Sequence, residues 1–198
     1  MWYLNADSGF RIAEYPNHRG WLEMFGGYQF WHTTHQATGV TQVACDPSAI
    51  PALPPCAAVG TVSNQGETVI TNTSNWHSIR VGVATEYRLT RRLSVLGTLG
   101  LIPISVLDNK DVHHLRGDLK QDPSFSMVGY GVGADADVGV RFMIINNLAV
   151  NLGYRVYYNR VLDGDFTVHP VAGASESFPL TQFESFRQGL TAGLSFTF

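Results

Sequence analysis

The sequence contains no uninterrupted run of about 18 apolar residues, the minimum for a membrane-spanning helix, so that class is excluded. Charged residues are also scarce, at 15% of the chain, whereas a typical soluble domain has about 25%. The formal net charge is only −3 and no basic cluster occurs, so we expect no nucleic-acid partner. A length of 198 residues suits a single domain, 1–198.

Cysteine is nearly absent. Cys45 and Cys56 are the only two, in a stretch rich in proline and alanine. This spacing within a loop predicts a disulfide formed in an oxidising compartment, and a pair of free thiols is the alternative. Residues 1–7 also lack the basic and apolar stretches of a signal peptide. An exported chain needs one, so we expect either that it was removed or that the chain begins inside a longer protein.

The last residues of the chain alternate between two kinds of side chain. One set is apolar and aromatic apart from one glutamine: Phe186, Gln188, Leu190, Ala192, Leu194, Phe196 and Phe198. The other set is small or polar: Arg187, Gly189, Thr191, Gly193, Ser195 and Thr197. A period of two predicts a strand. An apolar face and a small polar face are typical of a strand between lipid and an aqueous lumen.

Six further segments repeat this alternation, which gives about seven strands. They lie around Phe10 and Ile12 and at 22–30, 79–89, 93–106, 130–142 and 148–158. The connections alternate between short turns and long loops near 33–77, 107–126 and 159–185. This is the pattern of an antiparallel transmembrane β-barrel of the bacterial outer membrane, with its long loops facing the cell exterior. Bacterial barrels have even strand numbers, so we expect the barrel to be incomplete at its N-terminus.

Charged residues fall on the predicted inner face of these strands. The set is Glu23, Arg80, Glu86, Arg88, Asp135, Asp137, Arg141, Arg155 and Arg187. Both signs are present, and an unpaired charge in a confined interior is costly. We therefore predict a structural network of ion pairs in the lumen, in preference to a set of catalytic groups.

The second long loop opens with the run Asp108-Asn109-Lys110-Asp111-Val112-His113. Asp111 and His113 are two residues apart, so they project from one face if the strand continues. A carboxylate beside an imidazole raises its pKa and fixes its tautomer, which suits a general base. Two aspartates and two histidines could also bind zinc, but we expect a solvated loop before a metal site, and no metal is predicted.

The chain resembles the omptins, outer-membrane aspartyl proteases with ten strands and an active site in the extracellular mouth. The resemblance lies in the strand order, the Gly-Tyr-Gln core of 22–39, residues 78–89, the Asp-Asn-x-Asp-x-His run, and the closing Thr-Ala-Gly-Leu-x-Phe-x-Phe. It implies that Asp111 and His113 form a dyad that polarises water for attack on a peptide bond. It also implies that Asp108 helps to bind a basic substrate side chain.

The sequence departs from the family in two places. The omptins carry a second pair of aspartates on the opposite wall, in an Asp-Trp-Met-Asp-like motif, and no such motif precedes the first segment here. Lys110 and Val112 replace acidic residues that are common in the family, which weakens a negatively charged mouth.

Two functional hypotheses therefore stay open. The protein is an omptin-type endopeptidase if the full-length chain supplies the aspartate pair. Alternatively, it is a catalytically inactive barrel that acts as an adhesin, a docking platform or a structural subunit. The resemblance implies outer-membrane lipid and lipopolysaccharide as partners, besides peptide substrate or other envelope proteins. Lipopolysaccharide is a candidate requirement for activity, and no other cofactor is expected.

Overall fold

The computed structural model describes residues 1–43 and 58–196, and in these residues the chain is all-β. Its elements form one antiparallel sheet, with one short 3-10 turn, η1 (Pro16–His18), between the first two strands. The strands are β1 (Trp2–Glu14), β2 (Gly20–Thr41), β3 (Val62–Arg88), β4 (Leu93–His113), β5 (Phe125–Ile145), β6 (Leu148–Val168), β7 (Glu176–Pro179) and β8 (Glu184–Phe196). No helix in the described residues is long and apolar enough to cross a membrane.

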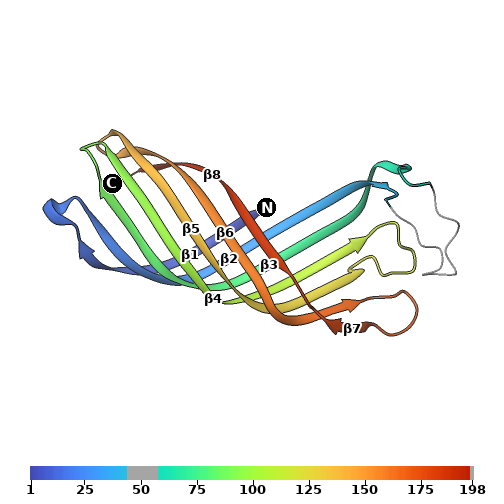
Figure 1. Cartoon of the computed structure of the whole chain (residues 1–198). Coiled ribbons are helices and arrows are strands. Elements are labelled where there is room, and N and C mark those ends of the chain that lie inside the picture. Colours follow the sequence, from blue (N-terminus) through green and yellow to red (C-terminus); the bar gives the residue numbers. More distant parts are fainter. Residues whose placement is uncertain (44–57, 197–198) are drawn as a thin grey trace.

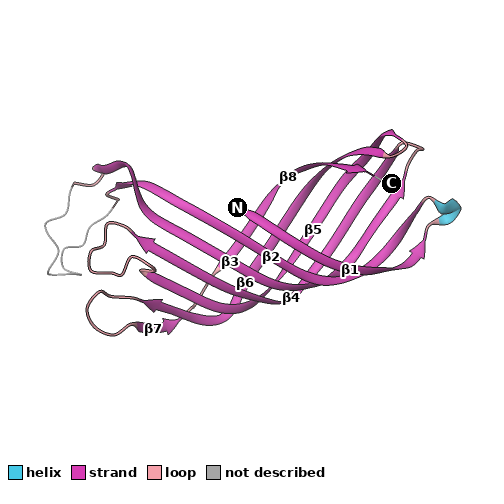
Figure 2. Ribbon diagram, turned by 180° about the vertical axis from the view of Figure 1, so that it is seen from behind, coloured by secondary structure: helices cyan, strands magenta, loops and turns pink. Residues whose placement is uncertain are grey.

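The strands pair in chain order from β1 to β6, and the sheet curves into a trough (Figures 1 and 2). Strand β6 then pairs with β7 along its last residues and with β8 along the rest. The antiparallel all-β prediction is confirmed. The sheet is not closed into a barrel within the described residues, because it remains open between β1 and the β7/β8 edge.

The strands are longer than the sequence analysis predicted, and the loops are shorter. Strand β2 continues to Thr41 and β3 starts at Val62, so much of the predicted loop 33–77 is sheet. The same correction applies to 107–126 and 159–185, since β4 ends at His113 and β6 at Val168. Strand β7 lies inside the last of these ranges, which makes eight strands in place of seven. The alternation fails to mark the strand ends from Thr33 to Gln36 and from Asn72 to Asn75, because both faces are polar there.

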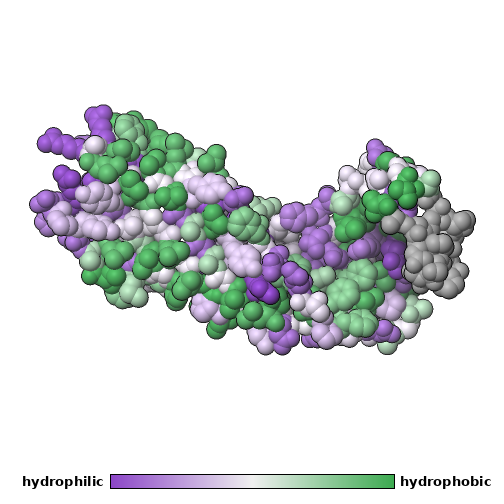
Figure 3. All heavy atoms as spheres, in the orientation of Figure 1, coloured by the Kyte–Doolittle hydropathy of each residue, from purple (hydrophilic) through white to green (hydrophobic). Residues whose placement is uncertain are grey.

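The outer face of the sheet carries exposed apolar side chains along most of its strands. Examples on β4 are Leu99, Leu101 and Ile104, which are 56–60% exposed. Similar residues line the other strands: Ile79, Val81, Val83, Val132, Val138, Val140, Phe142, Leu152, Leu190, Leu194 and Phe196. In Figure 3 apolar side chains gather in broad patches over the visible surface of the strands.

The inner face has three zones along the strands. A charged zone lies toward the turns that join β3 to β4 and β5 to β6, and it holds Asp7, Glu23, Arg80, Glu86, Asp135, Asp137, Arg141 and Arg155. An apolar cluster follows: Trp31, Trp76, Ile102, Leu107, Tyr157 and Val161, with Leu180 and Phe183 packed against it. A polar ladder then lies near the opposite strand ends, and it consists of Asn72, Ser74, Asn109 and Asp111.

Candidate functional site at the rim

An irregularity in β4 determines which of its residues face inward near the rim. The pairing of β4 with β5 shifts register between Ile102 and Ser105, where Pro103 lies. Proline has no N–H to donate to the ladder, so it is tolerated at such a bulge. Ile102 and Ser105 are both buried, and the period of two then continues through Leu107 and Asn109. Asp111 shares this inner face, as strand alternation requires.

Asp111 belongs to a chain of hydrogen bonds between β3 and β4. The amide of Asn72 donates to Asp111 Oδ1 at 2.5 Å, and Ser74 Oγ donates to Asn72 Oδ1 at 3.1 Å. Asn109 Nδ2 completes the ladder by donating to Ser74 Oγ at 2.7 Å. Among the described residues no cation pairs with Asp111 at salt-bridge distance. Its carboxylate is therefore held in place by the neutral amide of Asn72.

His113 lies at the end of β4, on the same face as Asp111. Its imidazole packs edge-on against the ring of Phe125, with the ring centroids 4.8 Å apart at 85°. Phe125 in turn stacks on Phe166 at 5.4 Å. No hydrogen bond joins the imidazole to Asp111 within residues 1–43 and 58–196. The structure thus brings the two predicted catalytic residues to one face without direct contact between their polar groups.

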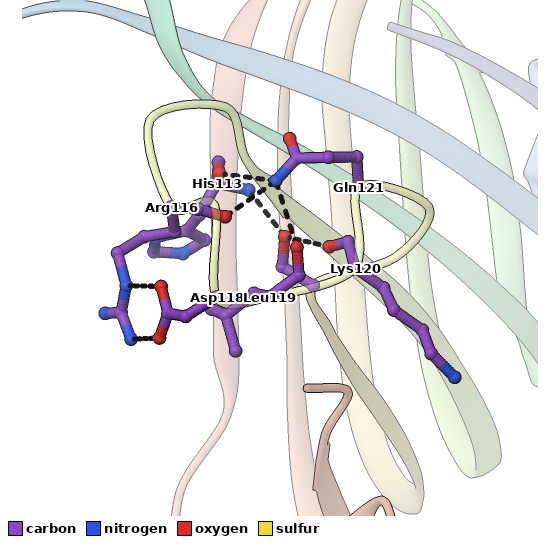
Figure 4. Close-up of polar contacts among 7 residues, drawn as sticks. His113, Arg116, Asp118, Leu119, Lys120 and Gln121 are labelled. Carbon is purple, nitrogen blue, oxygen red and sulfur yellow. Dashed lines mark hydrogen bonds and ion pairs between the residues drawn. The ribbon is translucent and has the colours of Figure 1, made fainter. Parts of the chain in front are cut away.

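The loop after β4 fixes the backbone of His113 (Figure 4). The His113 N–H donates to Ser124 Oγ at 2.9 Å, and its carbonyl oxygen accepts from Gln121 Nε2 at 3.2 Å. The same Gln121 amide donates to the carbonyl oxygens of Arg116 and Leu119. The two N–H groups of a single amide are thus shared among three carbonyl oxygens of the loop, which keeps the loop compact.

An ion pair closes the outside of this loop. Arg116 Nε and Nη2 donate to the two oxygens of Asp118 at 2.7 and 2.6 Å, a bidentate geometry (Figure 4). The hydrogen bonds from Arg116 lower the pKa of the Asp118 carboxyl from 3.8 to about 2. The same contact raises the pKa of Arg116.

Asp108, the predicted substrate-binding residue, lies on the opposite face of the sheet from Asp111 and His113. It stands across from Asn75 on β3 and Val128 on β5, and Val128 is 54% exposed on the outer surface. Its distance of three residues from Asp111 causes this, because an odd separation along a regular strand reverses the face.

The predicted inner charges form several ion pairs in the charged zone. Arg80 lies between two carboxylates, with Nη1 at 2.9 Å from Asp7 and Nη2 at 2.6 Å from Asp135. Arg141 pairs with Glu86 at 2.6 Å, and Arg155 pairs with Asp137. Asp7 was missing from the sequence-based set. The alternation Tyr3, Asn5, Asp7 could have found it, had residues 2–12 been followed as one strand.

Three members of the predicted network have no carboxylate or cation partner within the described residues. Glu23 lines the same hollow as Asp7 and Arg80, and Arg88 lies near the β3–β4 turn. The guanidinium of Arg187 lies over the rings of Trp31 and Tyr157, at 5.0 and 5.5 Å from their centroids. In the part of the chain that the structure describes, no three metal-ligating side chains come together. The predicted disulfide between Cys45 and Cys56 lies outside the described residues.

Comparison with known proteins finds no family model that matches the chain and no curated protein that matches it. The functional argument therefore rests on the faces of the sheet and on the groups at its rim.

Proposed function

We propose that this chain forms much of the wall of a bacterial outer-membrane β-barrel of the omptin type. On this proposal it acts as an endopeptidase, and Asp111 and His113 activate water in the extracellular mouth. The observation that carries the proposal is the position of these two residues. They share the inner face of β4, beyond the point at which the outer face changes from apolar to polar.

The outer face of β4 supports the membrane part of the proposal. Leu101, Ile104 and Val106 are exposed there, and Asp108 and Lys110 follow on the same face. A transmembrane β-strand needs about 9–11 residues. Strand β3 has 27 residues, so it is long enough to cross lipid and to project well beyond it. On this proposal Asp111 and His113 lie in the projecting part, in contact with external water.

The chemistry assigned to the dyad is general-base catalysis. His113 takes a proton from water as the oxygen attacks the peptide carbonyl carbon, and it returns that proton to the leaving amine. Asp111 orients the imidazole and stabilises its charged form. For this contact the imidazole must turn away from Phe125 toward Asp111. Catalytic hydrogen bonds often form only once substrate is bound.

The partners follow from the same proposal. They are outer-membrane lipid and lipopolysaccharide at the outer face, and a peptide in the mouth. Lipopolysaccharide is the one added component that we propose for activity. A substrate-binding role for Asp108 rests on the resemblance alone. The position of Asp108 on the outer face directs its side chain away from the dyad and does not support that role.

A second candidate function is a barrel without catalysis that docks other envelope proteins. The contacts at the rim favour it: the imidazole of His113 packs on Phe125, and the carboxylate of Asp111 is bound by Asn72. Both groups are engaged with the protein itself in this arrangement.

Peptide cleavage separates the two functions. The full-length protein, refolded in detergent with lipopolysaccharide, is incubated with a fluorogenic peptide that contains two adjacent basic residues. The protease proposal expects cleavage, and His113→Ala should slow it by about 10²–10⁴-fold, the usual contribution of a general base. Lys110→Ala, on the outer face of the same strand, serves as the control and should retain most activity. Absence of cleavage by the folded wild-type protein would leave the docking function.

A further inference from the structure

The two edges of the sheet run parallel to each other. Six antiparallel steps lead from β1 through β6 to β8, and an even number of reversals restores the starting direction. Antiparallel pairing of β1 with β8 is therefore impossible. An odd number of added strands, the one next to β8 running antiparallel to it, would close the sheet with the antiparallel pattern maintained throughout.

A cavity of about 160 Å³ lies where these two edges approach each other. Tyr3 on β1 lines one side, and Gln188, Gly189 and Thr191 on β8 line the other. Figure 1 shows the N-terminal end of β1 beside β8. The floor of the cavity is the inner face of the sheet, with Trp31, Arg155, Tyr157 and Arg187.

Arg187 is the unusual residue of this cavity. The rings of Trp31 and Tyr157 flank its guanidinium, and its Nη1 is buried without a hydrogen-bond partner. Arg155, above Tyr3 at 5.2 Å, also has an unpartnered buried Nη1, although its other nitrogens bind Asp137. Two guanidinium groups thus line one cavity, and each has a buried Nη1 without a hydrogen-bond acceptor.

The arginines of the charged zone have the carboxylate partners that Arg187 lacks. Arg80, Arg141 and Arg155 each bind at least one carboxylate. A guanidinium taken out of water is costly unless it is paired, and its planar fork matches a carboxylate with two parallel hydrogen bonds. The partner that the Arg187 guanidinium lacks is therefore a carboxylate, as supplied by an acidic side chain.

We propose that Arg187 is the binding site for a carboxylate carried by a β-strand that pairs with β8. The strand runs antiparallel to β8, and its acidic residue faces inward at the level of Arg187 and Tyr157, which are paired in register. Alternation leaves its apolar residues on the outer face, beside Leu190, which is 89% exposed. The site depends on the barrel architecture and is independent of proteolysis.

The test uses the 198-residue chain, folded in detergent micelles, and labelled synthetic strands. The first peptide has about ten residues, the length of a transmembrane strand, with alternating apolar and small polar side chains and one central inward Asp. The second peptide carries Asn at that position. Fluorescence anisotropy should show at least tenfold tighter binding of the Asp peptide. Equal affinity of the two peptides would overturn the proposal.

Variants locate the effect at Arg187. Arg187→Gln should remove the preference for Asp, whereas Arg88→Gln, outside the cavity, should preserve it. If Arg187→Gln does not fold, Arg187→Lys replaces it and should weaken the preference, because an ammonium lacks the bidentate fork. If the Arg187 variant still binds the Asp peptide more tightly than the Asn peptide by the wild-type ratio, the proposal is wrong.

Free carboxylate is the control for the source of the anion. Acetate at tens of millimolar should leave the preference for the Asp peptide in place, since the strand positions its own carboxylate. If acetate abolishes the preference, the site binds small anions and the strand is not its ligand. Peptide cleavage is measured separately, so failure of this proposal and failure of the protease proposal are distinct results.

Discussion

The charged zone and the polar ladder lie on the same inner face, yet their carboxylates have different partners. In the charged zone Asp135 is 6% exposed and bonds to Arg80, which also binds Asp7. At the ladder Asp111 is partly exposed and bonds to the neutral amide of Asn72. Carboxylates that neutralise buried arginines are committed to the fold. A partly exposed carboxylate without a cation is available for other chemistry.

The largest expected effect concerns the charged zone. Arg80→Ala leaves the carboxylates of Asp7 and Asp135 without their cation, and breaking such a buried pair costs about 3–5 kcal/mol. Urea unfolding in detergent, followed by tryptophan fluorescence, measures the loss. Arg11→Ala is the control, because Arg11 and Glu14 form an exposed pair. It should cost about 1 kcal/mol or less. Equal losses in the two variants would contradict the assignment.

The next effect separates lipid from water on the outer face. Leu101→Arg places a cation on the apolar part of β4, and near the midplane of a bilayer this costs about 2–4 kcal/mol. Val112→Arg, on the same face but beyond Asp108, should cost about 0–1 kcal/mol. Unfolding in lipid vesicles measures both. A similar cost at the two positions would mean that the lipid boundary does not lie between them.

A smaller effect is expected at the ladder. Asp111→Asn keeps a side-chain oxygen that can accept from Asn72, so the free energy of unfolding should change by about 1 kcal/mol or less. Under the protease proposal the same variant should abolish most cleavage. A stability loss as large as that of Arg80→Ala would assign Asp111 to the fold, which would contradict the difference between the two zones.

The smallest effect is the pH response of the loop after β4. Since the pKa of Asp118 is lowered from 3.8 to about 2, its pair with Arg116 contributes fully above pH 3.8 and is lost as the pH falls through about 2. The carbon chemical shift of the Asp118 carboxyl should report this titration. The Gln121 side-chain amide signals should change with it, and Asp118→Asn should remove the response. If Asp118 titrates at its ordinary pKa of 3.8, its ion pair with Arg116 does not form in solution.

Sequence patterns predicted the strands best where lipid is proposed to lie outside them. Apolar and polar residues alternate clearly there, as in 130–142 of β5. The sequence patterns failed to predict the strand ends from Thr33 to Gln36 and from Asn72 to Asn75, because these segments are polar on both faces and show no alternation.

The site was predicted in part. The spacing of Asp111 and His113 placed them on one face, but the contact of the imidazole with Phe125 depends on pairing with β5 and on the loop. The position of Asp108 on the outer face follows from alternation and could have been predicted. The odd count of strand patterns agreed with an open sheet, but the unpaired Arg187 could not be predicted, since its surroundings depend on strands brought together from distant parts of the chain.

The central claim is that the outer face of the sheet meets lipid and that the charged zone of its inner face meets water. Spin labels at successive positions from 93 to 107, with Cys45 and Cys56 replaced by serine, test it in reconstituted vesicles. We predict that accessibility to oxygen alternates with a period of two and is highest at outer positions, and that its phase shifts at Pro103 and Ile104. The water-soluble nickel complex should reach the inner positions of the charged zone, such as Thr98, and not the outer ones. Labels on both faces with equal access to the nickel complex would contradict the claim.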